Sequence, residues 1–470
     1  MSLPYRKGTM VLAKTKICLP GWGGFFMGRK FTVCLFTFPP QDATITAVSS
    51  FYGKGATAVL ADWAKSLFRW LWNVFRKGDN VLLAICVGAS ALGCIFIASA
   101  NNYRGYEHYV TVQLGAIAIG IVAYVLVSAI NLDFISEHRL WLVAFNTFLL
   151  LLLIPFGVDY SSGNKSWLAI PGVPVAIQPA ELCKVTFVLI LASVMSSYRQ
   201  RISNWRSVLA MGAQLMLLVV PNYLLSKDAG VSLIFVFIFI GMAFAGGVNL
   251  GWFGMGAGSV VAAWPLIWNK LMNQRQRNRI LVLFDPSIDP LGIDERYHSK
   301  RSLLSLTGGG LLGQGLFNGN RTQIGALPSQ HTDYIFSAIG EELGFVGCAL
   351  VLAVQAAIIW RIIYVGQKSQ DYLRKMVCFG CASVLIFQVI SNVGMCMGVT
   401  PVIGLTLPFF SYGGSSIVSL FAMLGLVSGV HARPKPQSHE LYIRYDYEKM
   451  DRRAEREARR KARRAKRNDP

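Results

Sequence analysis

An aspartate, Asp333, stands at the start of an apolar run in the segment LPSQHTDYIFSAIGEELGFVG, residues 327–347. A carboxylate at the edge of a membrane, shielded from bulk water, can act as a general base. Thr332 or Asp333 can also cap the N-terminus of the following helix, because the helix dipole favours negative charge there. The residues alone favour the cap. The neighbouring His331 is a candidate substrate-binding residue.

Two adjacent carboxylates, Glu341 and Glu342, follow inside the same apolar run. Ionisable side chains at membrane depth are costly and generally face a polar interior or a partner group. Neighbouring residues on a helix point about 100° apart, so one carboxylate can face a polar interior while the other packs elsewhere. We expect the pair to line a groove that binds substrate or to support helix packing.

A second cluster of polar and aromatic residues lies in GNKSWLAIPGVPVAIQPAELCK, residues 163–184. Trp167 can stack on a sugar or anchor the chain at the membrane interface, and the residues alone favour the anchor. Gln178, Glu181 and Lys184 follow at near-helical spacing. The spacing of three between Glu181 and Lys184 predicts an internal ion pair. The same side chains can line a polar cavity that faces a lipid head group.

A long segment between apolar runs, residues 269–332, combines basic side chains with glycines. Arginine forks and lysine ammonium groups suit a phosphate or diphosphate, and glycines let backbone amides approach a ligand closely. A flexible loop with a solvated charged face is the alternative, and this segment alone favours it. The basic residues are Arg275, Arg277, Arg279, Arg296, Lys300 and Arg301, and the glycines are Gly308, Gly309, Gly310, Gly313, Gly315 and Gly319.

The segment NVGMCMGVTPVIGLTLPFFSYGGSS, residues 392–416, interrupts an apolar stretch with proline and glycine. Irregular backbone at membrane depth is tolerated only where protein buries it or where it lines a cavity. We therefore expect this segment to be buried in the protein or to line a cavity. Ser411 and Ser415 within it are candidate substrate-binding residues.

The composition indicates a polytopic membrane protein. Of 470 residues, 53% are hydrophobic and 15% are charged, against roughly a quarter charged in soluble proteins. The mean hydropathy is +0.46. Much of the net charge of +21 lies after His431, where basic residues anchor a membrane protein to anionic lipid, so we expect no nucleic-acid partner. Cys378 and Cys381 form a CxxC inside an apolar run, which favours buried thiols over a redox pair.

Ten apolar runs approach the roughly 20 residues that a bilayer requires. The predicted fold class is an all-α polytopic membrane protein with a large extracytoplasmic loop between helices 7 and 8. Lysine and arginine concentrate in alternate loops and in the tail, which places both termini in the cytoplasm and residues 159–179 and 269–332 outside. The runs are residues 81–100, 110–130, 140–158, 180–197, 208–225, 230–247, 252–268, 335–359, 376–397 and 409–430.

The sequence divides into four parts. Residues 1–57 mix proline, glycine, cysteine and aromatics without a period, and we expect them to be disordered or to result from a misassigned start. Residues 58–79 alternate tryptophan and phenylalanine with lysine and arginine, as an amphipathic interfacial helix does. Residues 80–431 form the predicted transmembrane domain, and residues 432–470 form a basic cytoplasmic tail.

Three of these segments, residues 163–184, 327–347 and 392–416, resemble in this order the SEDS family (shape, elongation, division and sporulation), which includes RodA, FtsW and SpoVE. The resemblance runs from about residue 79 to residue 430. It implies a peptidoglycan glycosyltransferase that polymerises lipid II at the outer face of the bacterial cytoplasmic membrane, with a class B penicillin-binding protein as partner. It also implies that Asp333 is the catalytic base, which reverses the preference for a cap alone. Arginine or lysine of the long segment, or a divalent cation such as Mg²⁺ or Mn²⁺, would neutralise the departing diphosphate.

Several positions differ from the usual family pattern. Two glutamines, one serine and one proline of that pattern are replaced, and these changes concern the architecture around the site rather than Asp333 itself. The residues involved are His298, Arg301 and Ala180, together with the segment SKDAG, which keeps Asp228 and Gly230.

Two other functions stay open. A transporter of lipid-linked precursor would use Glu181, Lys184, Glu341 and Glu342 as a polar pathway through the membrane, although the sequence has no clear inverted repeat. A non-catalytic scaffold for the cell-wall machinery is the other alternative. The residues do not distinguish a role in elongation from one in division or sporulation.

Overall fold

The computed structural model describes residues 56–158, 165–169, 177–290 and 296–433. The expectations for residues 1–55 and for residues 434–470 of the basic tail lie outside the described residues.

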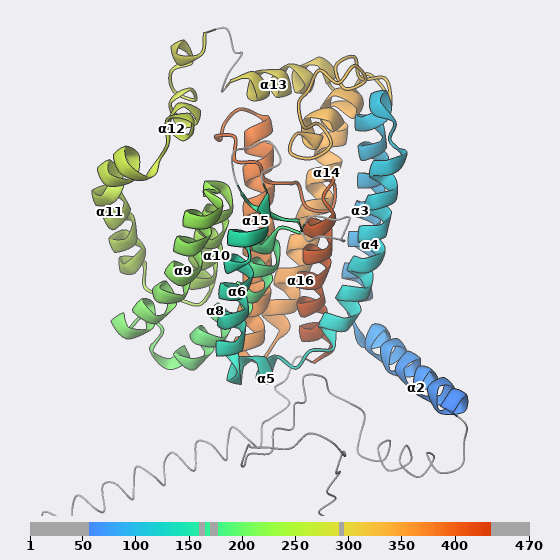
Figure 1. The fold of residues 1–470 in the computed structure, drawn as a ribbon, viewed down its shortest axis with the longest axis vertical. Coiled ribbons are helices and arrows are strands. Elements are labelled where there is room, and N and C mark those ends of the chain that lie inside the picture. The colour runs from blue at the N-terminus through green and yellow to red at the C-terminus, as the bar shows by residue number, and fades with distance from the viewer. Residues whose placement is uncertain (1–55, 159–164, 170–176, 291–295, 434–470) are drawn as a thin grey trace, which may run out of the picture. The chain divides into compact units, whose positions relative to one another are not determined.

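All ten predicted spans are helices (Figure 1). Nine helices in the described part of the chain are long and apolar enough to cross a membrane, and the remaining predicted span, α10, is a shorter apolar helix of 17 residues. The third span is divided, because α6 ends at Leu151 and α7 follows before a short antiparallel strand pair. The all-α polytopic fold class is confirmed.

The amphipathic segment predicted near residue 58 is a helix as well, and the long segment after the seventh span contains the helices α12 and α13. In chain order the elements are α2 (Ala56–Lys77), α3 (Asn80–Asn101), η1 (Asn102–Arg104), α4 (Glu107–Ser128), α5 (Leu132–Glu137), α6 (Arg139–Leu151), α7 (Leu153–Phe156), β1 (Gly157–Val158), β2 (Trp167–Leu168), α8 (Pro179–Ser197), η2 (Arg199–Arg201), α9 (Trp205–Ser226), α10 (Ala229–Ala245), α11 (Leu250–Leu266), η3 (Ile267–Leu271), α12 (Gln274–Leu281), η4 (Pro286–Ile288), α13 (Tyr297–Gly309), α14 (Ile335–Lys368), α15 (Tyr372–Cys396) and α16 (Gly414–Ala432).

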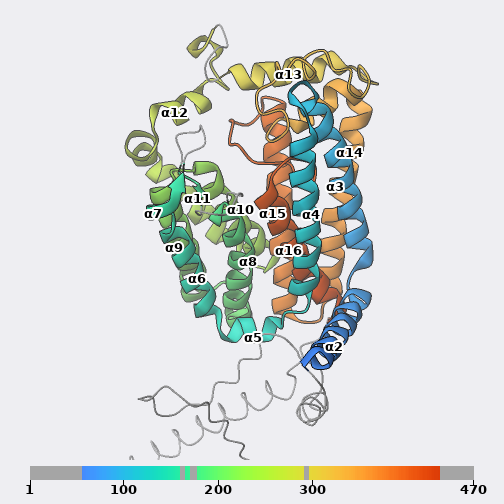
Figure 2. The same cartoon turned by 45° about the vertical axis from the view of Figure 1, so that its right-hand side comes forward.

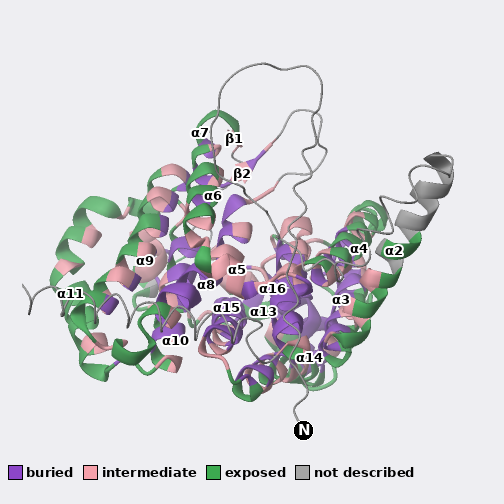
Figure 3. Ribbon diagram, turned by 90° about the horizontal axis from the view of Figure 1, so that it is seen from below, coloured by how far each residue is buried: buried purple, intermediate pink, exposed green. Residues whose placement is uncertain are grey.

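The core of the bundle lies among α8, α15 and α16, which are the most buried spans. Figure 2 shows α15 and α16 at the centre of the bundle, with α4 and α14 beside them. The outer helices turn apolar side chains outward, as helices in contact with lipid do. The helix α11 is the extreme case, because none of its residues is buried, and Figure 3 shows it almost entirely exposed.

Short polar side chains fix where several spans begin. Asp79 and Asp228 each accept a hydrogen bond of 3.1 Å from the amide three residues further along, at the starts of α3 and α10. Asn273 forms a reciprocal capping box at the start of α12. These side chains satisfy amides that the first turn of a helix leaves without a partner.

The helix α14 begins differently, and the predicted cap at Thr332 or Asp333 is wrong. Tyr334 precedes the helix and makes no side-chain cap. The chain enters α14 through a turn in which the amide of Tyr334 and the hydroxyl of Thr332 both donate to the carbonyl of Ser329. The start of α14 therefore makes no use of the Asp333 carboxylate.

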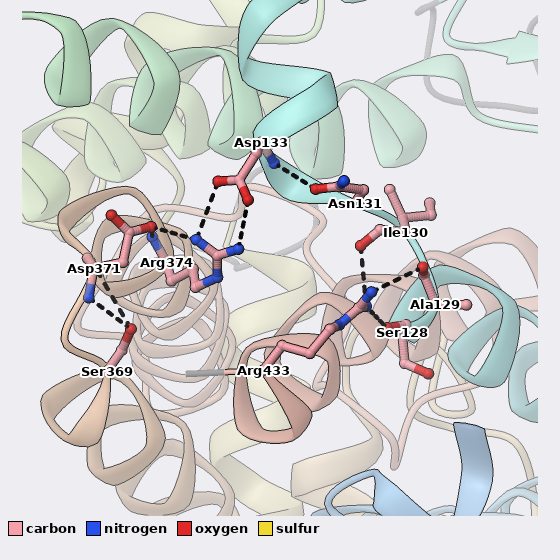
Figure 4. Close-up of polar contacts among 9 residues, drawn as sticks. All are labelled: Ser128, Ala129, Ile130, Asn131, Asp133, Ser369, Asp371, Arg374 and Arg433. Atoms are coloured by element: carbon pink, nitrogen blue, oxygen red, sulfur yellow. Dashed lines mark hydrogen bonds and ion pairs between the residues drawn. The ribbon is translucent and has the colours of Figure 1, made fainter. Parts of the chain in front are cut away.

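Two arginines join helix ends at the end of the bundle where α5 lies (Figure 4). Arg374 donates to both carboxylate oxygens of Asp133 at 2.8 and 3.1 Å and to Asp371 at 2.7 Å. Arg433 donates to the carbonyls of residues 128–130 at the C-terminal end of α4, where the last carbonyls of a helix lack partners. Together they fix the starts of α5 and α15 and the end of α16.

We expect Arg374→Ala to destabilise the fold by about 3–5 kcal/mol, because it leaves two carboxylates without their buried cation. The side chain of Arg374 is only 3% exposed. Thermal unfolding in detergent measures the effect. Arg206→Ala is the matched control, because Arg206 is exposed and stacks only on Trp205. Equal melting temperatures for the two variants would contradict the prediction.

Candidate functional site

The irregular segment that follows α15 is largely buried over residues 405–411, whereas residues 397–404 are partly or fully exposed, so the predicted burial applies to its second half. Together with α15 it holds the backbone around Asp333. The side-chain amide nitrogen of Asn392, Nδ2, donates to the carbonyl of Asp333 at 2.8 Å and to the carbonyl of Leu405 at 2.7 Å. Ser411 donates to the carbonyl of Thr332 at 2.6 Å, and the amide of Tyr412 donates to the carbonyl of His331. Two segments far apart in sequence are thereby joined at residues 331–333.

The Asp333 side chain is partly exposed, and no described residue donates a hydrogen bond to its carboxylate. Burial raises the pKa of Asp333 to about 6, and the nearby charge of Asp228 acts in the same direction. A Cβ added at Gly404 would lie 3.7 Å from Asp333 Oδ2. Gly404 has a φ of +75°, a conformation that glycine adopts readily, so the backbone passes close to the carboxylate.

Asp228 is a second carboxylate of this site that the sequence analysis did not select. It caps α10 through the amide of Val231 and accepts a hydrogen bond from Ser166 at 3.4 Å. Burial raises the pKa of Asp228, although these hydrogen bonds and the charge of Arg279 oppose the shift. The sequence signal for Asp228 was the segment SKDAG, which keeps an aspartate and a glycine two residues apart. A Cβ on Gly230 would collide with Ile403, so the glycine permits the start of α10 to approach the segment that contains Ile403.

Of the predicted basic residues, Arg279 is the one whose hydrogen bond brings it to this site. Its guanidinium donates to the carbonyl of Val402 at 3.3 Å, beside the glycine that faces Asp333. Arg275 is exposed on the same helix, α12, while Lys300 is exposed on α13. Arg301 packs over the ring of Tyr297 at 5.3 Å. The long segment thus presents its basic residues on short helices.

Glu341 and Glu342 are both fully enclosed by protein donors. Glu341 accepts from the amides of Arg321 and Thr322 and from the Thr322 hydroxyl, at 2.7–3.1 Å. Glu342 accepts from Ser99 at 2.6 Å and from Gln323 at 2.8 Å. The pair therefore supports packing, holding the glycine-rich segment against α14, while a role in substrate binding stays a prediction.

The predicted glycines of this segment also help to hold it against α14. The amides of residues 314 and 315 donate to the carbonyls of Glu341 and Glu342, and a Cβ on Gly313 would collide with the carbonyl of Glu342. Inside α14, Gly344 has a φ of +65° at a kink, which accommodates the bound segment.

The predicted ion pair in the second cluster is present, with Lys184 Nζ 2.8 Å from Glu181 Oε1 and both residues buried. Ser419 of α16 donates to the other Glu181 oxygen at 2.8 Å. Gln178 precedes α8 and is partly buried, and Trp167 is partly buried in β2. These contacts explain how the cluster packs; substrate binding by Trp167, Gln178, Glu181 and Lys184 stays a prediction.

The remaining candidates lie close to the irregular segment. His331 packs against Tyr412, with ring centroids 5.6 Å apart. The Ser415 hydroxyl is buried and has no hydrogen-bond partner in the described chain. Among the described residues no three His, Cys, Asp or Glu side chains form a group that could hold a metal ion, and the divalent cation stays a prediction.

A family model described as "Cell cycle protein", for FtsW, RodA and SpoVE, matches residues 80–435. The chain is 31% identical over 357 residues to the peptidoglycan glycosyltransferase MrdB of Escherichia coli K12, which covers 76% of this chain and 92% of that protein. It is 30% identical to a probable peptidoglycan glycosyltransferase FtsW of Geobacter metallireducens, over 77% of this chain and 96% of that protein.

Solved structures agree with this similarity. A structure described as the structural coordination of polymerization and crosslinking by a peptidoglycan synthase complex matches with a TM-score of 0.63 and 27% identity, over 76% of this chain and 98% of that one. The crystal structure of the rod shape determining protein RodA of Thermus thermophilus matches with a TM-score of 0.54 and 25% identity, over 75% and 96% of the two chains.

We expect Glu341→Gln to destabilise the fold by about 1–3 kcal/mol, because the amide group of glutamine would face a donor that the carboxylate now satisfies. Melting temperature and limited proteolysis within residues 313–325 measure the change. Glu107→Gln is the control, since Glu107 is exposed in the first turn of α4. If both variants melt and digest as the unmodified protein does, Glu341 does not hold this segment.

Proposed function

We propose that this chain, which belongs to the FtsW, RodA and SpoVE family of cell-cycle proteins, is a peptidoglycan glycosyltransferase that polymerises lipid II for cell shape or division. The observation that carries the proposal is Asp333: a partly exposed carboxylate to which no described residue donates, at the junction of two family motif segments. The relatives named as glycosyltransferases support the reaction class.

In the proposed reaction, a sugar 4-hydroxyl of one lipid II attacks the anomeric carbon of another. The new bond joins the hydroxyl oxygen to that carbon, the bond from the carbon to the diphosphate oxygen breaks, and the configuration inverts. Asp333 accepts the hydroxyl proton, and the lipid diphosphate leaves with the bonding electrons. A carboxylate with a pKa of about 6 is ionised at pH 7 and is a stronger base than an ordinary aspartate.

Asp228 acts as a positioning residue. Because α10 and Ser166 hold its carboxylate in place, its negative charge remains near Asp333 and raises the pKa of that base. No direct contact of Asp228 with substrate is needed for this effect.

The departing diphosphate needs positive charge close to the reacting centre. Arg279 has the best position for this role, because it donates to the carbonyl of Val402 and Gly404, two residues further along, lies close to the Asp333 carboxylate. Arg275, Lys300 and Arg301 would extend the basic surface toward the substrate. A divalent cation, if one binds, would supply charge for the same leaving group.

We infer the membrane orientation from charge. Asp333 lies before the start of α14, whereas Arg374 lies at the start of α15, after α14 has crossed the bundle. Basic residues mark the cytoplasmic side, so we place Arg374 and both termini in the cytoplasm. The site and the 269–332 segment then face the outside of the bacterial cytoplasmic membrane. Lipid II and a class B penicillin-binding protein are the proposed partners, supported by the similar synthase complex.

Asp333→Asn is expected to reduce polymerisation of labelled lipid II by at least about 100-fold, since positioned general bases contribute roughly 10²–10⁴. The assay uses purified protein together with the penicillin-binding protein. Asp285→Asn, an exposed aspartate of the same long segment, is expected to remain active. Normal polymerisation by Asp333→Asn would remove the assigned base, and lipid II flipping by the unmodified protein without polymerisation would favour a transporter.

The rate is also expected to depend on pH. Because the base must be ionised, activity falls as pH decreases through about 6 and is level above it. Asp228→Asn keeps a side chain that can cap α10 but removes a negative charge, so the acidic limb moves to lower pH. The pH profiles of the two proteins measure this shift. Superimposable profiles would show that Asp228 does not tune the base.

A further inference from the structure

Three aromatic side chains from separate parts of the chain form a cluster that includes His331, two residues before Asp333. Tyr109 comes from the first turn of α4, His331 from the segment before Asp333, and Tyr412 from the segment before α16. The ring centroids are 5.1 Å apart for Tyr109 and His331, 5.4 Å for Tyr109 and Tyr412, and 5.6 Å for His331 and Tyr412. All three residues are partly exposed.

Buried hydrogen bonds hold this aromatic cluster in place. Gln113, one turn beyond Tyr109 on α4, is fully buried; its amide nitrogen donates to the carbonyl of Ser411 and its amide oxygen accepts from the amide of Gly413, both at 3.2 Å. The amide of Tyr412 donates to the carbonyl of His331 at 2.8 Å. The rings therefore share one rigid backbone frame with the catalytic aspartate.

The cluster is uncharged at neutral pH. Burial and the charge of Arg104 lower the pKa of His331 to about 4, so its ring is a neutral hydrogen-bonding group. Partly exposed tyrosine and neutral histidine rings offer flat apolar faces with polar edges. That combination matches a pyranose ring, which has an apolar C–H face and a rim of hydroxyls. The three rings themselves carry no cation of the kind that binds a diphosphate.

Two groups of different chemistry therefore contact the segments around Asp333. Arg279 approaches it through residues 402–404, whereas the aromatic cluster approaches it through residues 331 and 411–412. The leaving diphosphate belongs with the arginine. The sugar that carries the attacking hydroxyl must reach Asp333 from elsewhere, and the aromatic cluster is the surface suited to it.

We propose that Tyr109, His331 and Tyr412 form a subsite that stacks on a pyranose ring of the attacking saccharide and directs its hydroxyl to Asp333. This subsite rests on the proposed glycosyl transfer and names the surface that selects the acceptor. None of the three residues is required to take part in proton transfer.

The test measures initial rates of polymerisation against lipid II concentration. Tyr109→Leu is expected to raise the apparent KM about tenfold and to change kcat by less than about threefold, because a stacking contact contributes to binding more than to chemistry. Tyr109→Phe, which restores the ring, is expected to recover most of the affinity. Tyr109→Met, which fills the space without a ring, replaces the leucine variant if that variant does not fold.

Tyr106→Leu is the matched control, because Tyr106 is an exposed tyrosine just before α4 and outside the cluster. If Tyr109→Leu has the KM of this control, or loses kcat and melting temperature at unchanged KM, the rings only pack the fold and the subsite is refuted. Failure of the unmodified protein to polymerise would instead refute the proposed function. Binding of fluorescent lipid II to the Tyr109 variants would then still test the subsite.

Discussion

Moving an ionised carboxylate out of water costs several kcal/mol unless donors replace its lost hydration. In this bundle Asp79, Glu181, Glu341 and Glu342 are all buried, and each receives a hydrogen bond or an ion pair from another element. The partners of Asp79, Glu181 and Glu342 lie more than 200 residues away in sequence. Asp333 differs, since its carboxylate receives no donor from the described residues. The fold satisfies these four carboxylates with donors, and Asp333 is the carboxylate to which our proposal assigns proton transfer.

The backbone around Asp333 is fixed even though its side chain is not. Asn392 of α15 and Ser411 of the irregular segment after it bind the carbonyls of Asp333 and Thr332, so these two elements together determine where the Asp333 backbone lies. The glycine-rich segment is held separately, by Glu341 and Glu342 on the first turns of α14. Two sets of hydrogen bonds thus converge on the start of one helix, and a rigid setting of this kind suits a general base.

The sequence predicted the parts of this architecture that depend on local pattern. Hydropathy located all ten spans, and a spacing of three residues predicted the pair of Glu181 and Lys184. The cap at Asp333 was wrong because a turn to Ser329, not visible in the spacing, begins α14. The donors to Glu342 and the proximity of Asp228 to Asp333 were not predictable either. Asp228 lies about 100 residues before Asp333, and Ser99 lies over 200 residues before Glu342, so neither contact follows from local spacing.

The exposure of α11 has a consequence for how the membrane itself acts on the site. Because none of its residues is buried within this chain, its apolar surface is open to lipid, and a mismatch between helix length and hydrocarbon thickness can be relieved by tilting. The helix α12, which carries Arg279, follows η3 directly after α11. A tilt of α11 would therefore reach Arg279 and its contact with Val402, which gives the acyl-chain length of the host lipid a mechanical route to the proposed site.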